Sequence, residues 1–267
     1  MTLVRIVKSW TKPDLLRQTP GGTGTWGDIR FTLDPVERCD YLIALNHLPE
    51  DLTIEVPAAN VWCFIQEPPV PSYRWLRRGF SSFARVYTPD AALAGPRYIH
   101  RHGSLPWHVD RSYDRLNETP PPTKTKDLSW ITSDARNKPG HTLRMDFLDR
   151  LRAGVSFDLF GRGFQPIDDK WDGLAPYRYA IAFENHSGPD YWTEKIADCF
   201  LAGAMPFYYG ATNIADYFPR ESYIPIDPRD PATPRRIAEI VASDLAEKNR
   251  DAIAEARRRV LEEHQFF

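Results

Sequence analysis

The sequence predicts an α/β protein with two domains, the second of them Rossmann-like. A chain of 267 residues exceeds the usual size of one compact domain. A polar, proline-rich stretch, "NETPPPTKTKD", interrupts the hydrophobic pattern near the middle and is typical of a linker. After it, strand-like and helix-like segments alternate, as in a parallel sheet with crossover helices. We therefore expect a first domain at 1–117, a linker at 118–127 and a second domain at 128–267.

The first domain is expected to contain short strands separated by turns. Strand-like apolar runs occur at 4–7, 40–45, 61–65 and 85–88. In the glycine-rich stretch "GGTGTWG", Gly22, Gly24 and Gly27 have the G-x-G-x-x-G spacing, but the stretch follows no predicted strand, so we expect a flexible loop there rather than a phosphate-binding loop.

The second domain is expected to alternate strands and helices. Two helices are marked by apolar stripes, one formed by Leu143, Phe147, Leu148 and Leu151 and the other by Ile196, Phe200 and Leu201. Asp190 is expected to cap the second of these helices, and Thr233 a later one. The predicted segments are strands at 128–135, 155–161, 179–183 and 205–210, helices at 140–154 and from about 190, and helical tracts from 233 to the end.

Composition excludes several classes of function. The net charge of −2 provides no basic field for nucleic acid or an anionic membrane, and no apolar window approaches the length of a membrane span. Three widely spaced cysteines predict neither a disulfide framework nor a zinc site. The histidines do not have metal-ligand spacing, and we expect the "HRH" pair, His100 and His102, at the surface. A cytoplasmic location is the resulting expectation.

Two cations are expected at one edge of the second sheet. Lys195 lies in the first turn of its predicted helix, where a cation is normally unfavourable, and Arg144 lies in the first turns of the other helix. Helix starts and cations at the carboxyl ends of parallel strands suit a nucleoside diphosphate. The alternative is that both are surface residues, Lys195 paired with Asp198 and Arg144 with Asp146 or Asp149. No Walker A or D-x-D pattern is present, and no G-x-G-x-x-G follows a predicted strand.

The segment "YRYAIAFENHSGPDYWTEKIADCFLAGAMPFYYGATNIADYFPRESYIPID", residues 177–227, resembles the signature of the α-1,3/1,4-fucosyltransferases, glycosyltransferase family ten. Weaker similarity extends through "ITSDARNKPGHTLRMDFLDRL" and "CFIQEPPVPSY", and the chain is similar to the soluble bacterial type. The resemblance implies a GT-B architecture, in which two Rossmann-like domains face a central cleft. It also implies GDP-fucose in the second domain and an oligosaccharide acceptor at the first.

The resemblance also implies roles for individual residues. Lys195 and Arg144 match residues that contact the pyrophosphate, and Glu194 one that contacts sugar or ribose hydroxyls. The other residues implied for the donor side are Asn185 and Tyr191, which line the pocket, and Glu184 and Ser187, which support the donor loop. The implied reaction is an inverting transfer that needs neither a metal nor another cofactor.

Glu67 is the expected general base. It follows the apolar run "VWCFI" and precedes "PPVP", which places it at the carboxyl end of a first-domain strand, and it matches the base-bearing glutamate of the family. A solvated strand-end glutamate is the alternative.

Two other functions stay open: transfer from a different nucleotide sugar, and a binding module without chemistry. A bacterial cytoplasmic protein, peripheral to the inner membrane at most, is expected, and the acceptor and the oligomeric state are left open.

Overall fold

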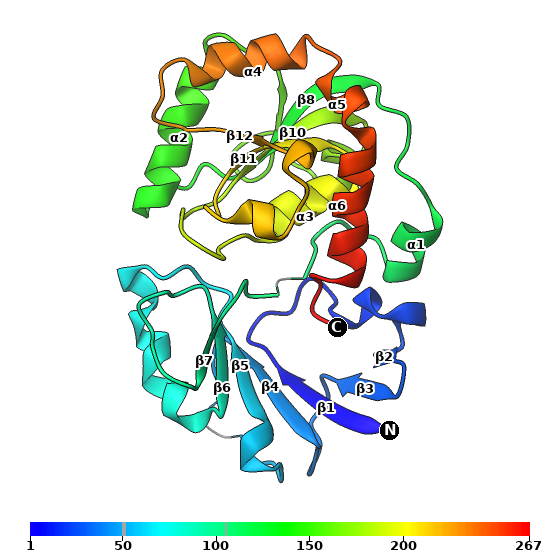
Figure 1. Ribbon diagram of the computed structural model, residues 1–267, viewed down its shortest axis with the longest axis vertical. Coiled ribbons are helices and arrows are strands. Elements are labelled where there is room, and N and C mark those ends of the chain that lie inside the picture. Colours follow the sequence, from blue (N-terminus) through cyan, green and yellow to red (C-terminus); the bar gives the residue numbers. More distant parts are fainter. Residues whose placement is uncertain (50–51, 105) are drawn as a thin grey trace.

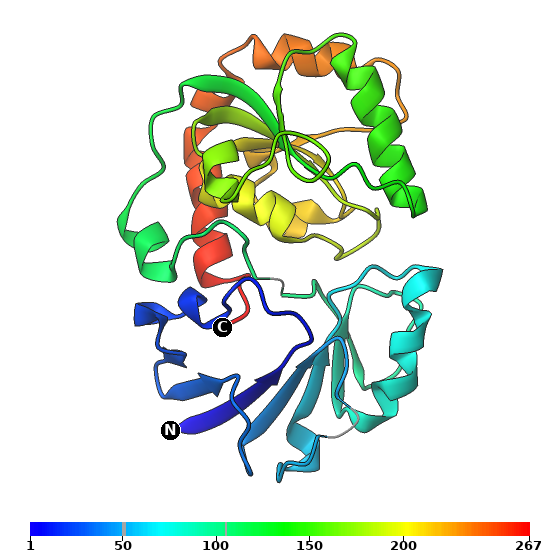
Figure 2. The ribbon, with the colours of Figure 1, turned by 180° about the vertical axis from the view of Figure 1, so that it is seen from behind.

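The computed structural model describes residues 1–49, 52–104 and 106–267. They form two α/β domains stacked one above the other, each built on its own sheet (Figures 1 and 2). The strands of the first sheet rise toward the second domain, so their carboxyl ends face the space between the domains (Figure 1). The predicted fold class, with two Rossmann-like domains in the GT-B arrangement, is confirmed.

The first domain holds a seven-stranded sheet in the order β2-β3-β1-β4-β5-β6-β7. Its neighbouring strands pair in parallel, apart from the antiparallel β2–β3 pair. The strands are β1 Thr2–Val7, β2 Thr25–Trp26, β3 Ile29–Thr32, β4 Tyr41–Leu45, β5 Val61–Phe64, β6 Arg85–Thr88 and β7 Tyr98–His100. Short 3₁₀ helices connect them: η1 Leu16–Gln18, η2 Pro20–Gly22, η3 Ala58–Asn60 and η4 Pro71–Ser82.

The second domain holds a five-stranded parallel sheet in the order β12-β11-β10-β8-β9. Its strands are β8 Lys126–Ile131, β9 Asp158–Phe160, β10 Tyr177–Phe183, β11 Met205–Tyr209 and β12 Ile224–Pro225. The α-helices are α1 Tyr113–Glu118, α2 Pro139–Arg152, α3 Glu194–Leu201, α4 Thr233–Val241, α5 Leu245–Lys248 and α6 Arg250–Glu262, and the 3₁₀ helices are η5 Lys170–Gly173, η6 Ile214–Asp216 and η7 Arg220–Ser222.

Most predicted elements are confirmed, with shifts at their ends. The strand expected at 128–135 ends at Ile131, and helix α4 begins at Thr233 after Ala232 in the cap position, so Thr233 is not its cap. Part of the stretch "GGTGTWG", where a flexible loop is expected, belongs to η2 and to the edge strand β2. Gly24 is required there: its φ is +71°, and a Cβ would lie 2.8 Å from the carbonyl oxygen of Phe31.

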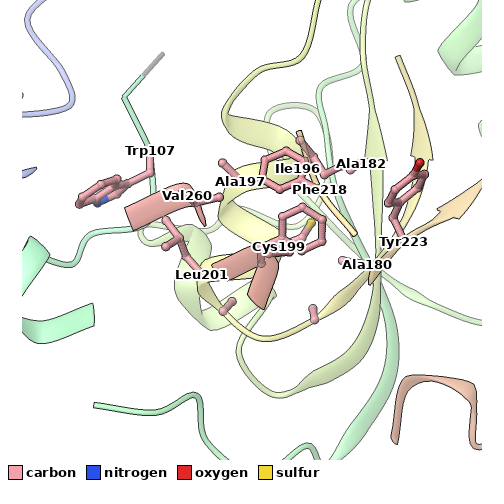
Figure 3. Close-up of a cluster of buried hydrophobic side chains, with 14 of the residues drawn as sticks. Trp107, Ala180, Ala182, Ile196, Ala197, Cys199, Leu201, Phe218, Tyr223 and Val260 are labelled. Carbon is pink, nitrogen blue, oxygen red and sulfur yellow. The ribbon is translucent and has the colours of Figure 1, made fainter. Parts of the chain in front are cut away.

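Helices cover both faces of the second sheet. The apolar stripe of α2 packs with Trp130 and Phe183 on one face, and Phe147, Leu148 and Leu151 are fully buried there. On the other face, Ile196 and Cys199 of α3 pack against two alanines of β10, Ala180 and Ala182, and against Val260 of α6 (Figure 3). Full burial of such a leucine or phenylalanine side chain contributes about 1.5–3 kcal/mol. This packing fixes the starts of α2 and α3 at the carboxyl edge of the sheet.

The packing of the two domains crosses the predicted boundary in both directions. Trp107, Val109 and Leu116, which precede the predicted linker, lie in the second-domain core. The last two residues, Phe266 and Phe267, pack against the first sheet near Phe31 and Phe64.

The surface position expected for His102 is wrong, although its neighbour His100 is exposed. His102 is 2% exposed and stacks on Trp192 of the second domain, with ring centroids 4.2 Å apart. Burial between the domains removes this imidazole from water, which holds the pKa of His102 well below its ordinary value.

The three cysteines, Cys39, Cys63 and Cys199, are free and buried. Within the part of the chain that the structure describes, no helix combines the length and hydropathy needed to cross a bilayer.

Candidate functional site

A cavity of about 670 Å³ opens at the carboxyl edge of the second sheet, beside the starts of α2 and α3. Four of the predicted donor-side residues line it: Arg144, Asn185, Glu194 and Lys195. Loop residues 132–133 and 135–138, which follow β8, complete much of the wall, together with Arg162 and Lys170. The sequence-predicted cations therefore meet at one cavity, as parallel strands with crossover helices require.

Helix α3 begins at a threonine cap. Thr193 has extended backbone angles, and its hydroxyl accepts a hydrogen bond from the backbone N–H of Lys195. The expectation that Asp190 caps this helix is wrong, because Asp190 has a positive φ of 59° and lies before the cap. Its carboxylate accepts hydrogen bonds from Asn213 and from the hydroxyl of Tyr217, 2.6 Å away. Asp190 thus holds the loop that leads into α3.

Lys195 is held by Glu184, the residue that follows β10. The ammonium Nζ lies 3.1 Å from Oε2 of Glu184 and 2.9 Å from the hydroxyl of Thr193, which also contacts both carboxylate oxygens. Glu184 is fully buried, and this burial raises its pKa against the opposing effect of Lys195. Burial lowers the pKa of Lys195, but the carboxylates of Glu184 and Glu194 outweigh it, so the net shift is upward. The alternative pairing with Asp198 is wrong.

Glu194 lies at the centre of a second set of ion pairs. Its Oε1 is 3.3 Å from Nζ of Lys170, 3.6 Å from Nζ of Lys195 and 3.8 Å from Nδ1 of His108. Burial raises the pKa of Glu194, but Lys195 and Lys170 outweigh burial and hold that pKa well below its ordinary value. Glu194 is therefore a carboxylate whose orientation is fixed by cations on two sides.

Lys170, which sequence reasoning missed, joins η5 to α3, and its partner Asp198 holds the segment before the linker. Its Nζ lies 3.0 Å from Oδ2 of Asp198, and Oδ1 of Asp198 accepts hydrogen bonds from the backbone N–H groups of His108 and Val109. Burial lowers the pKa of Lys170, but the carboxylates of Asp198 and Glu194 outweigh burial, so the net shift of that pKa is upward. No local pattern marked Lys170, because it lies at the start of the short 3₁₀ helix η5 and meets its partners only after folding.

Arg144 extends from α2 toward the loops after β8 and β10. One terminal nitrogen donates to Oδ1 of Asn185 at 2.8 Å, and the other donates to the carbonyl and the hydroxyl of Ser133 at 3.1 and 3.2 Å. The side chain is buried, which lowers its pKa. The alternative pairing with Asp146 or Asp149 is wrong, since Arg136 binds both carboxylates.

The charge of the cavity favours an anion. Its lining includes six cationic side chains, Arg136, Lys138, Arg144, Arg162, Lys170 and Lys195, and the carboxylate of Glu194. Such a density of nitrogen donors at two helix starts suits phosphate oxygens. Among the described residues, the structure contains no group of three or more His, Cys, Asp or Glu side chains arranged to hold a metal ion.

Three predicted donor-side residues, Glu184, Ser187 and Tyr191, lie outside the lining of this cavity. Ser187 is exposed, and Tyr191 is 5% exposed. Burial raises the pKa of the Tyr191 hydroxyl well above its ordinary value, and the carboxylates of Glu184, Glu194 and Glu67 add to that rise. Tyr191 is therefore a buried phenol rather than part of the cavity wall.

Glu67 lies on the first-domain side of the cleft, after the carboxyl end of β5. It is half-buried and lines a small cavity together with Tyr73, Thr88 and Asp90. Lys138, at the start of α2, reaches toward this cavity from the second domain, and its Nζ donates to the hydroxyl of Tyr73 at 2.6 Å. Tyr73 and Lys138 were also missed by sequence reasoning, because their meeting depends on how the two domains pack.

Comparison with known proteins agrees with this architecture. Residues 121–251 match the family model described as glycosyltransferase family 10 (fucosyltransferase), C-term. The chain is 27% identical over 232 residues to alpha-(1,3)-fucosyltransferase 4 of Bos taurus, covering 80% of this chain and 55% of that protein. It is 26% identical over 173 residues to a 3-galactosyl-N-acetylglucosaminide 4-alpha-L-fucosyltransferase of Pongo pygmaeus, covering 62% of this chain and 44% of that one. The chain spans about half the length of the curated relatives it matches.

Solved structures share the fold. An alpha1,3-fucosyltransferase crystallised with GDP-fucose superposes with a TM-score of 0.57 at 16% identity, covering 96% of this chain and 82% of that chain. The same kind of enzyme with GDP gives 0.54 at 18% identity, with the same coverage. The two-domain fold, the cation-lined cavity at the carboxyl ends of β8 and β10, and the family match lead to one assignment: residues 121–251 of this chain belong to glycosyltransferase family 10, the fucosyltransferases.

Proposed function

We propose that this protein is an inverting, metal-independent glycosyltransferase that moves fucose from GDP-fucose to a hydroxyl of a glycan, namely the 3-OH of N-acetylglucosamine or glucose. The observation that carries the proposal is the meeting of Lys195 and Arg144 at one cation-lined cavity, within a segment that matches the fucosyltransferase family. The relatives' names supply the acceptor class, since they describe transfer to galactosyl-N-acetylglucosaminides.

The donor would bind with its pyrophosphate at the starts of α2 and α3. Arg144 is pre-oriented there by Asn185 and Ser133, and Lys195 by Glu184 and Thr193. Groups that are oriented before the reaction stabilise developing charge without further reorganisation. Glu194, held between Lys170 and Lys195, is suited to accept hydrogen bonds from sugar or ribose hydroxyls.

The transfer step would use Glu67 as general base. The acceptor oxygen attacks the anomeric carbon of fucose, its proton passes to the Glu67 carboxylate, and the bond from that carbon to the GDP oxygen breaks. The electron pair of the broken bond remains on GDP, where Lys195 and Arg144 would offset the new negative charge. Attack from the side opposite GDP inverts the anomeric configuration.

Two other functions remain to be tested against this proposal: transfer from another nucleotide sugar, and a binding module without chemistry. A bacterial, cytoplasmic location stays a prediction. A thermal-shift panel with GDP, UDP, ADP and their sugars addresses the donor, because a ligand that binds the folded protein raises its melting temperature. We expect GDP and GDP-fucose to stabilise the protein. Stabilisation by UDP but not by GDP would contradict the donor assignment.

Mass spectrometry and NMR of reactions with GDP-fucose address the chemistry. N-acetyllactosamine and lactose serve as acceptor probes, and we expect a fucosylated product with the anomeric configuration opposite to that of the donor. GDP binding with neither transfer to these acceptors nor hydrolysis of GDP-fucose would favour the binding module.

A further inference from the structure

Lys138 and Tyr73 connect the two domains across the cleft. Lys138 precedes α2 and lines the donor-side cavity, whereas Tyr73 lies in η4 of the first domain. Nζ of Lys138 donates to the Tyr73 hydroxyl at 2.6 Å and lies 4.3 Å from the centre of its ring. In Figure 1, η4 (cyan) lies directly below the lower end of α2 (green). The contact combines a charge-assisted hydrogen bond with a cation–π interaction.

Tyr73 is also the neighbour of Glu67. Both side chains line the same small cavity of the first domain. Burial raises the pKa of the Tyr73 hydroxyl, and the Glu67 carboxylate adds to the rise while Lys138 opposes it. A tyrosine hydroxyl has one donor and two acceptor positions. Because Lys138 occupies an acceptor position, the O–H of Tyr73 stays available to donate to the carboxylate of Glu67.

We propose that Tyr73 is a positioning residue for Glu67, and that Lys138 holds Tyr73 in place from the donor domain. This inference rests on the proposed function, in which Glu67 is the general base. The base belongs to one domain and the donor site to the other, and a misplacement of about 1 Å can cost roughly 100-fold in rate. The Lys138–Tyr73 contact ties the orientation of the base to the wall of the donor cavity.

The alternative is that this contact only holds the domains together, and a double-mutant cycle separates the two roles. Tyr73→Phe should lower kcat for transfer from GDP-fucose to N-acetyllactosamine roughly 10- to 100-fold, with the KM for GDP-fucose unchanged. In a Glu67→Gln background, the same substitution should cost nothing further, because a residue that acts through Glu67 loses its effect when the carboxylate is gone.

Lys138 provides the second arm of the experiment. Lys138→Met should lower kcat by a similar factor and add nothing to Tyr73→Phe, whereas Lys138→Arg should recover most of the rate because it keeps a cationic donor. The matched control is Tyr87→Phe, since the Tyr87 ring stacks on Phe64 and its hydroxyl makes no hydrogen bond to another described residue. This control should leave kcat unchanged. Melting temperatures of all variants confirm that rates refer to folded protein.

The outcomes distinguish the two hypotheses. Full kcat in Tyr73→Phe, or an equal further loss in the Glu67→Gln background, overturns the positioning role and leaves Glu67 as the base. Full transfer by Glu67→Gln alone overturns the base assignment itself, whatever Tyr73 does. A loss of kcat in Tyr73→Phe that vanishes in the Glu67→Gln background supports both the positioning role of Tyr73 and the assignment of Glu67 as the base.

Discussion

The ammonium of Lys195 lies 3.1 Å from Oε2 of Glu184, a carboxylate that is fully buried at the end of β10. A cation in the first turn of a helix is opposed by the helix dipole. Glu184 offsets that effect, and Glu194, also in the first turn of α3, lies 3.6 Å from the same ammonium. About a quarter of the Lys195 side chain remains exposed, on the wall of the cavity. The positive charge is therefore held in position before any anion binds.

Lys195→Ala should reduce transfer from GDP-fucose by on the order of 100-fold, or about 3 kcal/mol, because a preoriented donor for the leaving-group charge is lost. Steady-state kinetics with N-acetyllactosamine as acceptor measures this loss. The matched control is Lys248→Ala, since Lys248 pairs with Asp244 on an exposed helix. A rate unchanged by Lys195→Ala would leave Lys195 only as the structural partner of Glu184.

Glu184→Gln should destabilise the fold. The substitution keeps the shape of the side chain but leaves the partly buried ammonium of Lys195 without its nearest carboxylate, and we expect a loss of about 1–3 kcal/mol in the free energy of unfolding. Urea denaturation monitored by tryptophan fluorescence measures it. Asp244→Asn, which breaks only the exposed pair with Lys248, should leave the midpoint close to that of the unchanged protein. Equal midpoints for both variants would argue against a stabilising Glu184–Lys195 pair.

Glu67→Gln should abolish most transfer while donor binding survives. Loss of the general base is expected to lower kcat roughly 10²- to 10⁴-fold. Glu67 lies across the cleft from the donor cavity, so the affinity for GDP, measured by calorimetry, should stay the same. Loss of GDP binding in this variant would instead place Glu67 on the donor side.

The stability contributed by Glu194 should depend on pH in the acid range. Its folded-state pKa lies well below the ordinary value of 4.5, so folding favours the charged carboxylate. That stabilisation is complete above pH 4.5 and is lost as the pH falls from there through the folded-state pKa. The difference in melting temperature between the unchanged protein and Glu194→Gln should therefore shrink below about pH 4.5. A difference that stays constant down to pH 3 would contradict the ion-pair account. Glu239→Gln, which alters an exposed pair with Arg235, is the control.

Removal of divalent metal should leave the reaction unaffected. In the proposed mechanism, Lys195, Arg144 and the helix starts offset the charge of the leaving GDP, which is the task that a metal performs in many transferases. Kinetics after dialysis against EDTA, with and without added Mg²⁺ or Mn²⁺, measure the dependence. Activity that disappears with EDTA and returns with Mn²⁺ would show that the cations alone are insufficient.

Local patterns were enough to predict the elements that carry the donor site. Apolar stripes in α2 and α3 fixed which faces are buried, and they placed Arg144 and Lys195 near helix starts at one edge of a parallel sheet. Short strands such as β3, β7 and β12 were missed, because three or four residues at most carry too little periodicity. The capping residue of α3 was placed three residues too early, since Asp190 and Thr193 are both good caps in a sequence.

The sequence by itself determined the α/β fold class, the family resemblance and the cations at two helix starts, because periodicity and capping act between residues a few positions apart. Only the tertiary structure decided the partners of those cations. Glu184 reaches Lys195 across a loop, Lys170 bridges Glu194 and Asp198 from η5, and Lys138 meets Tyr73 across the cleft. Such contacts depend on strand order and on the packing of one domain against the other. Each buried charge pairs with the opposite charge that this packing brings close to it.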